Sequence, residues 1–199
     1  MAAKKRCPVC GSGDVRVESP STYEYENSGL SNVVLMGQGI VRITHCESCK
    51  NVTTVVRAEQ QLLQVIGLGL LQRPPGMKGE ELRYLRGLFE MTQADLAKSL
   101  GLPRRETVAE WENKKRVFAT PRDEITSRLI LLGLFKQRVI ESDHCALLPQ
   151  HVEVYDEFVK SFVDYAGKVL REDKKRPPSS GFNVRLRQRK RWSPELVPA

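Results

Sequence analysis

The chain has 199 residues, a formal net charge of +8 and five cysteines. That length suits one or two domains with a core of their own. No run of about 18 or more apolar residues occurs, so the sequence predicts no membrane span. The basic N-terminus MAAKKRCPVC has no apolar stretch behind it, so we expect no secretory signal and a cytoplasmic location.

The positive charge is concentrated near the C-terminus. Between Arg171 and Arg191 there are nine basic and two acidic residues, which leaves the rest of the chain close to neutral. Residues 177–181 are Pro-Pro-Ser-Ser-Gly, a composition that resists helix and sheet. We therefore predict a basic disordered tail over 171–199, with phosphate contact as one use for it.

Residues 1–57 carry a metal-ligand pattern. Cys7-Pro-Val-Cys10 and Cys46-Glu-Ser-Cys49 are two C-x-x-C pairs separated by 35 residues. Each pair followed by Gly11 or Lys50 can form a knuckle, and two knuckles complete a tetrahedral S4 site of the kind that holds one structural Zn²⁺. A disulfide pair and an iron site are the alternatives, and His45 is a further ligand in principle.

The interval between the cysteine pairs, and the segment that follows the second pair, are typical of short strands. Apolar and aromatic residues at 15–17, 23–25, 33–36, 40–44 and 52–56 are separated by proline and glycine. The sequence thus predicts a small antiparallel, zinc-ribbon-like β domain.

Residues 58–78 are predicted to be a helical linker that ends in a hinge. AEQQLLQVIGLGLL has many apolar positions, and Pro74, Pro75 and Gly76 end it. Its Gly-Leu-Gly lacks the preceding strand and third glycine of a phosphate loop. We expect its apolar residues to dock on the zinc domain or on a partner.

The run from Gly79 to Asn113 has the parts of a helix-turn-helix. Thr92 and Asp95 have capping-box spacing at the start of a second helix, and Gly101 falls where that helix must end with a positive φ. A third helix beginning near Arg104 to Glu106 keeps Val108 and Trp111 inward. Its outward positions are Glu106, Ala109, Glu110 and Asn113.

LRGLFEMTQADLAKSLGLPRRETVAEWEN is similar to the helix-turn-helix of the Xre and Cro/C1 repressor class. Together with the cysteine pattern, residues 7–135 resemble the MqsA/YgiT group of zinc-finger and helix-turn-helix antitoxins and regulators. The chain has one residue more than the usual pattern between Gly101 and Trp111, and it places Glu106 and Glu110 where the family tends to have amide or basic base-reading side chains. The resemblance implies a toxin partner for the N-terminal domain and DNA as the ligand of the third helix. The expected contacts are Thr92, Gln93, Arg104 and Arg105 near phosphates, Glu106, Thr107, Ala109 and Glu110 near bases, and Lys114, Lys115 and Arg116 in a basic wing.

The helix-turn-helix domain is predicted to extend to residue 140. Thr120, Pro121 and Asp123 mark another helix start, and the apolar residues from Ile125 to Phe135 exceed what a three-helix core needs. We expect another element or a second subunit to cover them.

Residues 141–170 are predicted to form a C-terminal packing or dimerisation helix, amphipathic from about His151 to Leu170. Asp143, His144 and Cys145 precede it, and without a signature for a partner we interpret them as loop or packing residues rather than a nucleophile.

The sequence therefore predicts an α+β multidomain protein: a β zinc domain, an all-α helix-turn-helix domain and a C-terminal helix. The first hypothesis is a sequence-specific transcriptional repressor of the antitoxin type that binds double-stranded DNA as a homodimer. The alternative is a protein-interaction adaptor with reduced or non-specific DNA binding. An enzyme is not expected, because no HExxH, Walker-type loop or GxSxG occurs and four thiolates close the metal shell.

Overall fold

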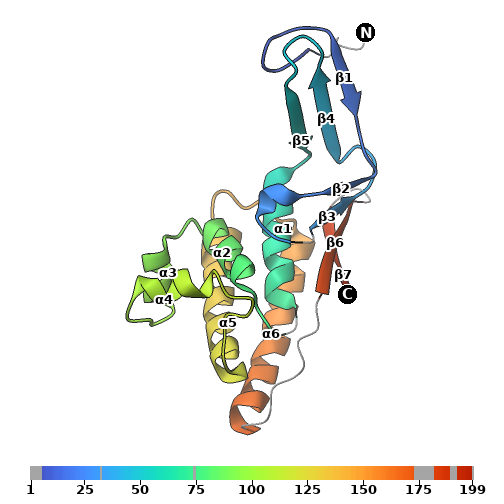
Figure 1. The fold of residues 1–199 in the computed structure, drawn as a ribbon. Helices are drawn as coiled ribbons and strands as arrows, with labels where there is room; N and C mark the ends of the chain where they lie inside the picture. Colours follow the sequence, from blue (N-terminus) through green and yellow to red (C-terminus); the bar gives the residue numbers. More distant parts are fainter. Residues whose placement is uncertain (1–5, 32, 74, 173–181, 189–191, 199) are drawn as a thin grey trace.

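A computed structural model describes residues 6–31, 33–73, 75–172, 182–188 and 192–198. The chain is α+β, with a small antiparallel sheet near the N-terminus followed by helices, as the sequence predicts (Figure 1). None of the helices among these residues combines the length and the apolar character needed to cross a membrane.

The first sheet has three antiparallel strands and projects from one end of the molecule (Figure 1). Its strands, in spatial order, are β1 (Val15–Glu18), β4 (Val41–Cys46) and β5 (Val52–Val56). Val15 lies opposite Cys46, and His45 lies opposite Val52. Val15 follows the first cysteine pair, and His45 and Val52 lie on either side of the second pair. The register therefore places both cysteine pairs at the same end of the sheet.

The second sheet joins both ends of the chain. Its order is β2 (Thr22–Glu24), β3 (Val34–Met36), β6 (Phe182–Gln188) and β7 (Trp192–Pro198), with β3 and β6 parallel and the other pairs antiparallel. The tail prediction differs from this structure, which has strands within 171–199. In Phe182–Gln188, FNVRLRQ, apolar and polar residues alternate, as in a strand. The prediction of disorder was based instead on the many charged residues around this segment. Arg171 and Glu172 end α6, and residues 173–181, 189–191 and 199 of the predicted tail lie outside the described residues.

The described residues form six α-helices: α1 (Glu59–Gln72), α2 (Gly79–Leu88), α3 (Gln93–Ser99), α4 (Arg105–Trp111), α5 (Pro121–Phe135) and α6 (Pro149–Glu172). A π-helical turn, Lys136–Ile140, continues α5. Thr92 caps α3 through the backbone N–H of Asp95, and Thr120 caps α5 through that of Asp123, so both predicted starts are confirmed.

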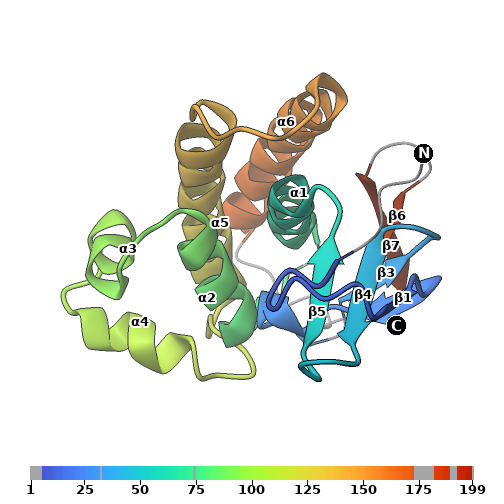
Figure 2. The same cartoon turned by 90° about the horizontal axis from the view of Figure 1, so that it is seen from above.

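Helix α1 is the centre of the fold rather than a linker between domains. It lies between α2, α5 and α6 on one side and strands on the other (Figure 2), and it contacts β7. Its residues Leu62, Val65, Ile66 and Leu71 are completely buried. The sequence predicts a helix here whose apolar residues dock on a neighbour, and the structure has that helix, with neighbours on several sides. An apolar helix without a polar face needs such neighbours to be covered.

The segment after α1 is anchored, although its composition predicts a hinge. The backbone N–H groups of Gly76 and Met77 donate hydrogen bonds to the Glu124 carboxylate of α5. Arg128 of α5 pairs with Glu124 at 2.9 Å and donates to the carbonyl of Leu71 at 2.9 Å. Because both side chains are almost fully buried, this connection is held to α5 at several points.

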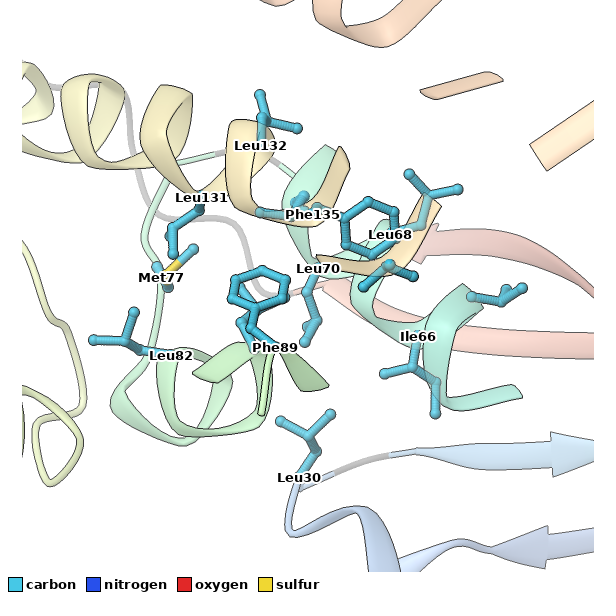
Figure 3. Packing of buried hydrophobic residues seen from close by; sticks show 14 of the residues in the cluster. Leu30, Ile66, Leu68, Leu70, Met77, Leu82, Phe89, Leu131, Leu132 and Phe135 are labelled. Atoms are coloured by element: carbon cyan, nitrogen blue, oxygen red, sulfur yellow. The ribbon is translucent and has the colours of Figure 1, made fainter. Parts of the chain in front are cut away.

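The apolar surface of α5 is covered within the same chain. Leu131 and Phe135 lie on the side of α5 that faces α1 and α2, and the ring of Phe135 meets that of Phe89, at the end of α2, edge to face with centroids 6.4 Å apart (Figure 3). Leu132 points to the other side of α5 (Figure 3). From the other side, Tyr155 of α6 stacks on Phe135 with ring centroids 5.8 Å apart and donates a hydrogen bond to the Leu132 carbonyl at 2.8 Å. This part of the core needs no second subunit.

Candidate metal centre and nucleic-acid interface

Four cysteine sulfurs converge at the free end of the first sheet. Cys7 Sγ lies 3.7 Å from Cys49 Sγ, Cys10 Sγ lies 3.5 Å from Cys46 Sγ, and all four sulfurs lie within 4.8 Å of one another. A tetrahedral Zn²⁺ with Zn–S bonds of about 2.3 Å needs sulfurs about 3.8 Å apart. All four are free cysteines, so the disulfide alternative is not what the structure contains. The cluster could hold a metal ion.

Two backbone knuckles position these sulfurs. The N–H of Val9 donates to Cys7 Sγ at 3.4 Å, and the N–H of Cys49 donates to Cys46 Sγ at 3.5 Å. The residue after each pair is left-handed, with φ of 73° at Gly11 and 58° at Lys50. Such a turn points N–H groups at the ligands, as the spacing predicts.

Hydrogen bonds set the protonation of the thiols. The N–H groups of Cys10 and Val9 lower the pKa of Cys7, and that of Asn51 lowers the pKa of Cys49 to about 6. The N–H of Ser12 lowers the pKa of Cys10, but hydrogen bonds to Cys46 and Cys49 outweigh it and raise that pKa to about 12. A cation bound by four thiolates therefore displaces protons, so metal affinity falls as the pH falls.

His45 lies apart from the metal ligands. It is adjacent to Cys46 on β4, where side chains alternate between the two faces of the sheet. Its Nε2 atom lies 3.8 Å from Glu18 Oε2, and the metal-ligand group among the described residues consists of the four cysteines. His45 is thus a strand residue.

Helices α3 and α4 form a compact pair at the edge of the molecule, on the side away from the second sheet (Figure 1). Gly101 ends α3 with a φ of 68°, as predicted, and Val108 of α4 is completely buried. Trp111 is half-buried and meets Phe118 edge to face at 5.2 Å. These contacts hold one face of α4 inward.

The opposite face of α4 is open to solvent. Arg104, Arg105, Glu106 and Glu110 are exposed, whereas Thr107 and Ala109 are half-buried. Arg105 Nε lies 3.1 Å from Glu106 Oε1. The pKa of Glu106 is lowered by its own backbone N–H and then by Arg105, so this carboxylate stays charged.

Glu112, which the sequence reading missed, fastens α4 to the two preceding helices. Its buried carboxylate accepts hydrogen bonds from Arg86 Nε of α2 at 2.5 Å and from Gln93 Nε2 of α3 at 2.9 Å. Burial alone would raise the pKa of Glu112, but the hydrogen bonds from Arg86 and Gln93 lower it. One sequence feature could have predicted this role: Glu112 directly follows the inward-facing Trp111, so it lies close to the core. The Gln93 amide, expected near phosphates, is engaged here.

The remaining predicted contacts lie around this pair of helices. Thr92, Lys114 and Lys115 are exposed, and Arg116 is half-buried. Lys114 and Lys115 line a groove of about 470 Å³ together with Lys78, which precedes α2, Arg83 of α2 and the acids Glu80 and Glu112. The wing therefore adds positive charge beside the exposed face of α4.

The Asp143–Cys145 loop is held through its backbone. Gln60 and Gln64 of α1 donate hydrogen bonds to the His144 carbonyl at 2.7 and 2.9 Å. Gln64 also accepts from the N–H of Ala146. These contacts suit a packed loop.

Comparison of the chain with protein-family models, with characterised proteins and with solved structures found no match. The resemblance to the MqsA/YgiT group therefore remains a prediction, supported only by the residues and geometry described above.

Proposed function

We propose that the chain is a sequence-specific DNA-binding transcriptional repressor of the antitoxin type. The observation that carries this proposal is α4, a short helix with Val108 buried and Glu112 anchored on one side and an exposed polar face on the other. A helix held outward by two supporting helices is how a helix-turn-helix enters the major groove.

The mechanism is equilibrium occupancy of an operator, with no reaction catalysed. A homodimer would present two α4 helices to half-sites about one helical turn apart. Thr92, Arg104, Arg105, Lys114 and Lys115 supply exposed polar or basic groups for phosphates. These phosphate contacts position the protein, and the face of α4 selects the sequence.

Zinc is the ion we assign to the four cysteines. Four thiolates at tetrahedral spacing suit Zn²⁺ and leave no open position for a reacting water, so the site is structural. The sheet behind it is the proposed docking surface for a toxin, because Val52 and Val55 of its edge strand β5 are 59% and 55% exposed. An unpaired edge with apolar side chains is suited to a protein partner.

Footprinting on the DNA upstream of the protein's own gene tests the repressor function. We expect a protected, pseudo-palindromic site, and we expect the binding constant to fall steeply between about 50 and 200 mM salt as phosphate contacts are screened. Equal binding to this DNA and to an unrelated fragment would rule out an operator.

The adaptor alternative draws on a specific observation, the two exposed carboxylates of α4. Replacing Glu106 and Glu110 together by alanine distinguishes the two functions. A repressor loses discrimination between operators, whereas an adaptor with decayed readout binds DNA more tightly and without selection, since two charges that repel phosphate have been removed.

A further inference from the structure

The exposed face of α4 is acidic in its centre and basic at its margins. Glu106 and Glu110 are four residues apart and both exposed, so they share one face of the helix. From residue 92 to residue 116 there are six basic and four acidic residues. The exposed cations lie before and after α4: Lys98, Arg104, Arg105, Lys114 and Lys115. A polyanion would be attracted to the margins and would meet carboxylates in the centre.

The two carboxylates differ in their surroundings. Glu106 is paired with Arg105 at 3.1 Å, so part of its charge is compensated within the protein. The side chain of Glu110 is exposed, and among the described residues no hydrogen bond or ion pair is found for it. Its carboxylate is therefore more available to accept from a ligand than that of Glu106.

Resting on the proposed function, we infer that Glu110 is a specificity-determining residue that selects a cytosine, and thus a G·C pair, in each operator half-site. Glu106 adds a weaker preference of the same kind. The inference goes beyond DNA binding because it states which base the protein requires.

The chemistry of the major groove restricts what a carboxylate can read. An ionised carboxylate only accepts hydrogen bonds. Guanine presents N7 and O6 and thymine presents O4, all acceptors that repel it, and adenine places its N7 acceptor beside its N6 amino donor. Cytosine offers the N4 amino donor with no acceptor on its own major-groove edge, so it is the base from which a carboxylate accepts best.

The spacing of the two carboxylates adds a second expectation. Four residues of α-helix advance about 6 Å along the axis, and successive bases along one DNA strand are about 3.4 Å apart. If α4 follows the groove, the preference set by Glu106 falls about two base pairs from that set by Glu110.

The test is selection of duplexes from a randomised pool by the full-length chain, with the variants Glu110→Gln and Glu110→Ala. We expect the wild type to enrich a cytosine at one position of each half-site, by about 5- to 150-fold over other bases. Glu110→Gln should shift that position towards adenine, because an amide offers both a donor and an acceptor to adenine N7 and N6. Glu110→Ala should leave it unselected. Glu153→Gln on α6 removes the same charge at another exposed site and should leave the selected sequence unchanged.

Each outcome is decisive. A cytosine preference that changes with residue 110 supports the inference. An enriched operator without that preference, or one that Glu110→Gln leaves unchanged, overturns the role of Glu110 while leaving DNA binding intact. If no variant enriches any sequence, the proposed function fails and the assignment of Glu110 fails with it.

Discussion

The first sheet and the helical body of this protein are stabilised in different ways. Around the metal-ligand knuckles the buried side chains are few, chiefly Cys7 and Cys46, while Val9, Val52 and Val55 are more than half exposed. In the helical body, by contrast, Leu62, Leu82 and many other residues are completely buried. Val41 and Val56, at the other end of the sheet, belong to the same buried cluster as the helices. Apolar burial therefore supports the helices and that end of the sheet, whereas we expect the end with the four cysteines to depend on a metal bound by their sulfurs.

The same comparison separates stability from function. The candidate DNA-reading face is on the well-packed body, so its geometry should survive the loss of the sheet. The proposed partner surface is on the sheet and should disappear with the metal. The predictions below test this division, in order of expected effect.

Loss of the metal should have the largest effect, and the effect should be local. Structural Zn²⁺ contributes about 10–16 kcal/mol to the folding of small zinc domains. Cys46→Ser should abolish stoichiometric metal binding and remove hydrogen-exchange protection from β4 and β5, while α1 and α5 remain protected. Cys145→Ser changes a cysteine outside the cluster and should alter neither measurement. Full protection of β4 in the Cys46 variant would show that the sheet does not need the metal.

Within the helical body, the buried carboxylate of Glu124 should matter most. Glu124→Ala leaves Arg128 buried without its ionic partner and the N–H groups of Gly76 and Met77 without an acceptor. Breaking a buried pair in this way costs about 3–5 kcal/mol, measured as the free energy of unfolding in denaturant. Glu141→Ala removes an exposed carboxylate 4.0 Å from Lys136 and should cost less than about 1 kcal/mol. Similar losses for the two variants would show that the cluster around Glu124 is unimportant.

Gly79 should tolerate no side chain. A Cβ atom there would overlap the backbone carbonyl oxygens of Trp111 and Glu112, which are held in place by the rest of α4. We expect Gly79→Ala to lower the free energy of unfolding by about 1–3 kcal/mol and to weaken DNA binding by displacing α4. Gly87→Ala on the same helix meets nothing within 4 Å and should be neutral or stabilising, by at most about 1 kcal/mol. Equal stability of the two variants would contradict the close approach at Gly79.

The smallest predicted effect is a pH dependence that involves Glu112. Its pKa is lower in the folded chain than in the unfolded chain, because Arg86 and Gln93 favour the charged form more than burial disfavours it. The resulting stabilisation is therefore present above the unfolded pKa of about 4.3 and is lost as the pH falls through the lower folded value. In denaturant titrations between about pH 7 and pH 3, Glu112→Gln should lose stability at neutral pH and show a weaker acid dependence than the wild type. A residual slope is expected from Asp95, whose pKa Thr92 also lowers. Identical slopes would exclude a contribution from Glu112.

Features of the site that depend on local spacing could be predicted. The two C-x-x-C pairs, the cap at Thr92 and the positive φ at Gly101 each follow from a few neighbouring residues, and the structure contains all three. Glu112 was missed because its role depends on Arg86 and Gln93, which belong to other helices. An exposed acid and an anchoring acid look the same in a sequence.

The limits of prediction for the fold have the same origin. Residues 58–78 were predicted to be a linker because the sequence of one apolar helix does not specify how many other elements will pack against it. The strands within 171–199 were not expected because β6 finds its partner in β3, about 150 residues earlier in the chain. Pairings between distant segments depend on the whole arrangement of the chain and leave little trace in local composition.

By itself, the sequence determined which four cysteines cluster, where α3 and α5 begin and the α+β class, because spacing and capping act over a few residues. Only the tertiary structure decided that α1 is central, that the Pro-Gly segment is anchored and that Glu112 is buried while Glu110 is exposed. The burial of a side chain and its pairing with another depend on which segments lie next to each other in space. The packing of the whole chain determines which segments these are.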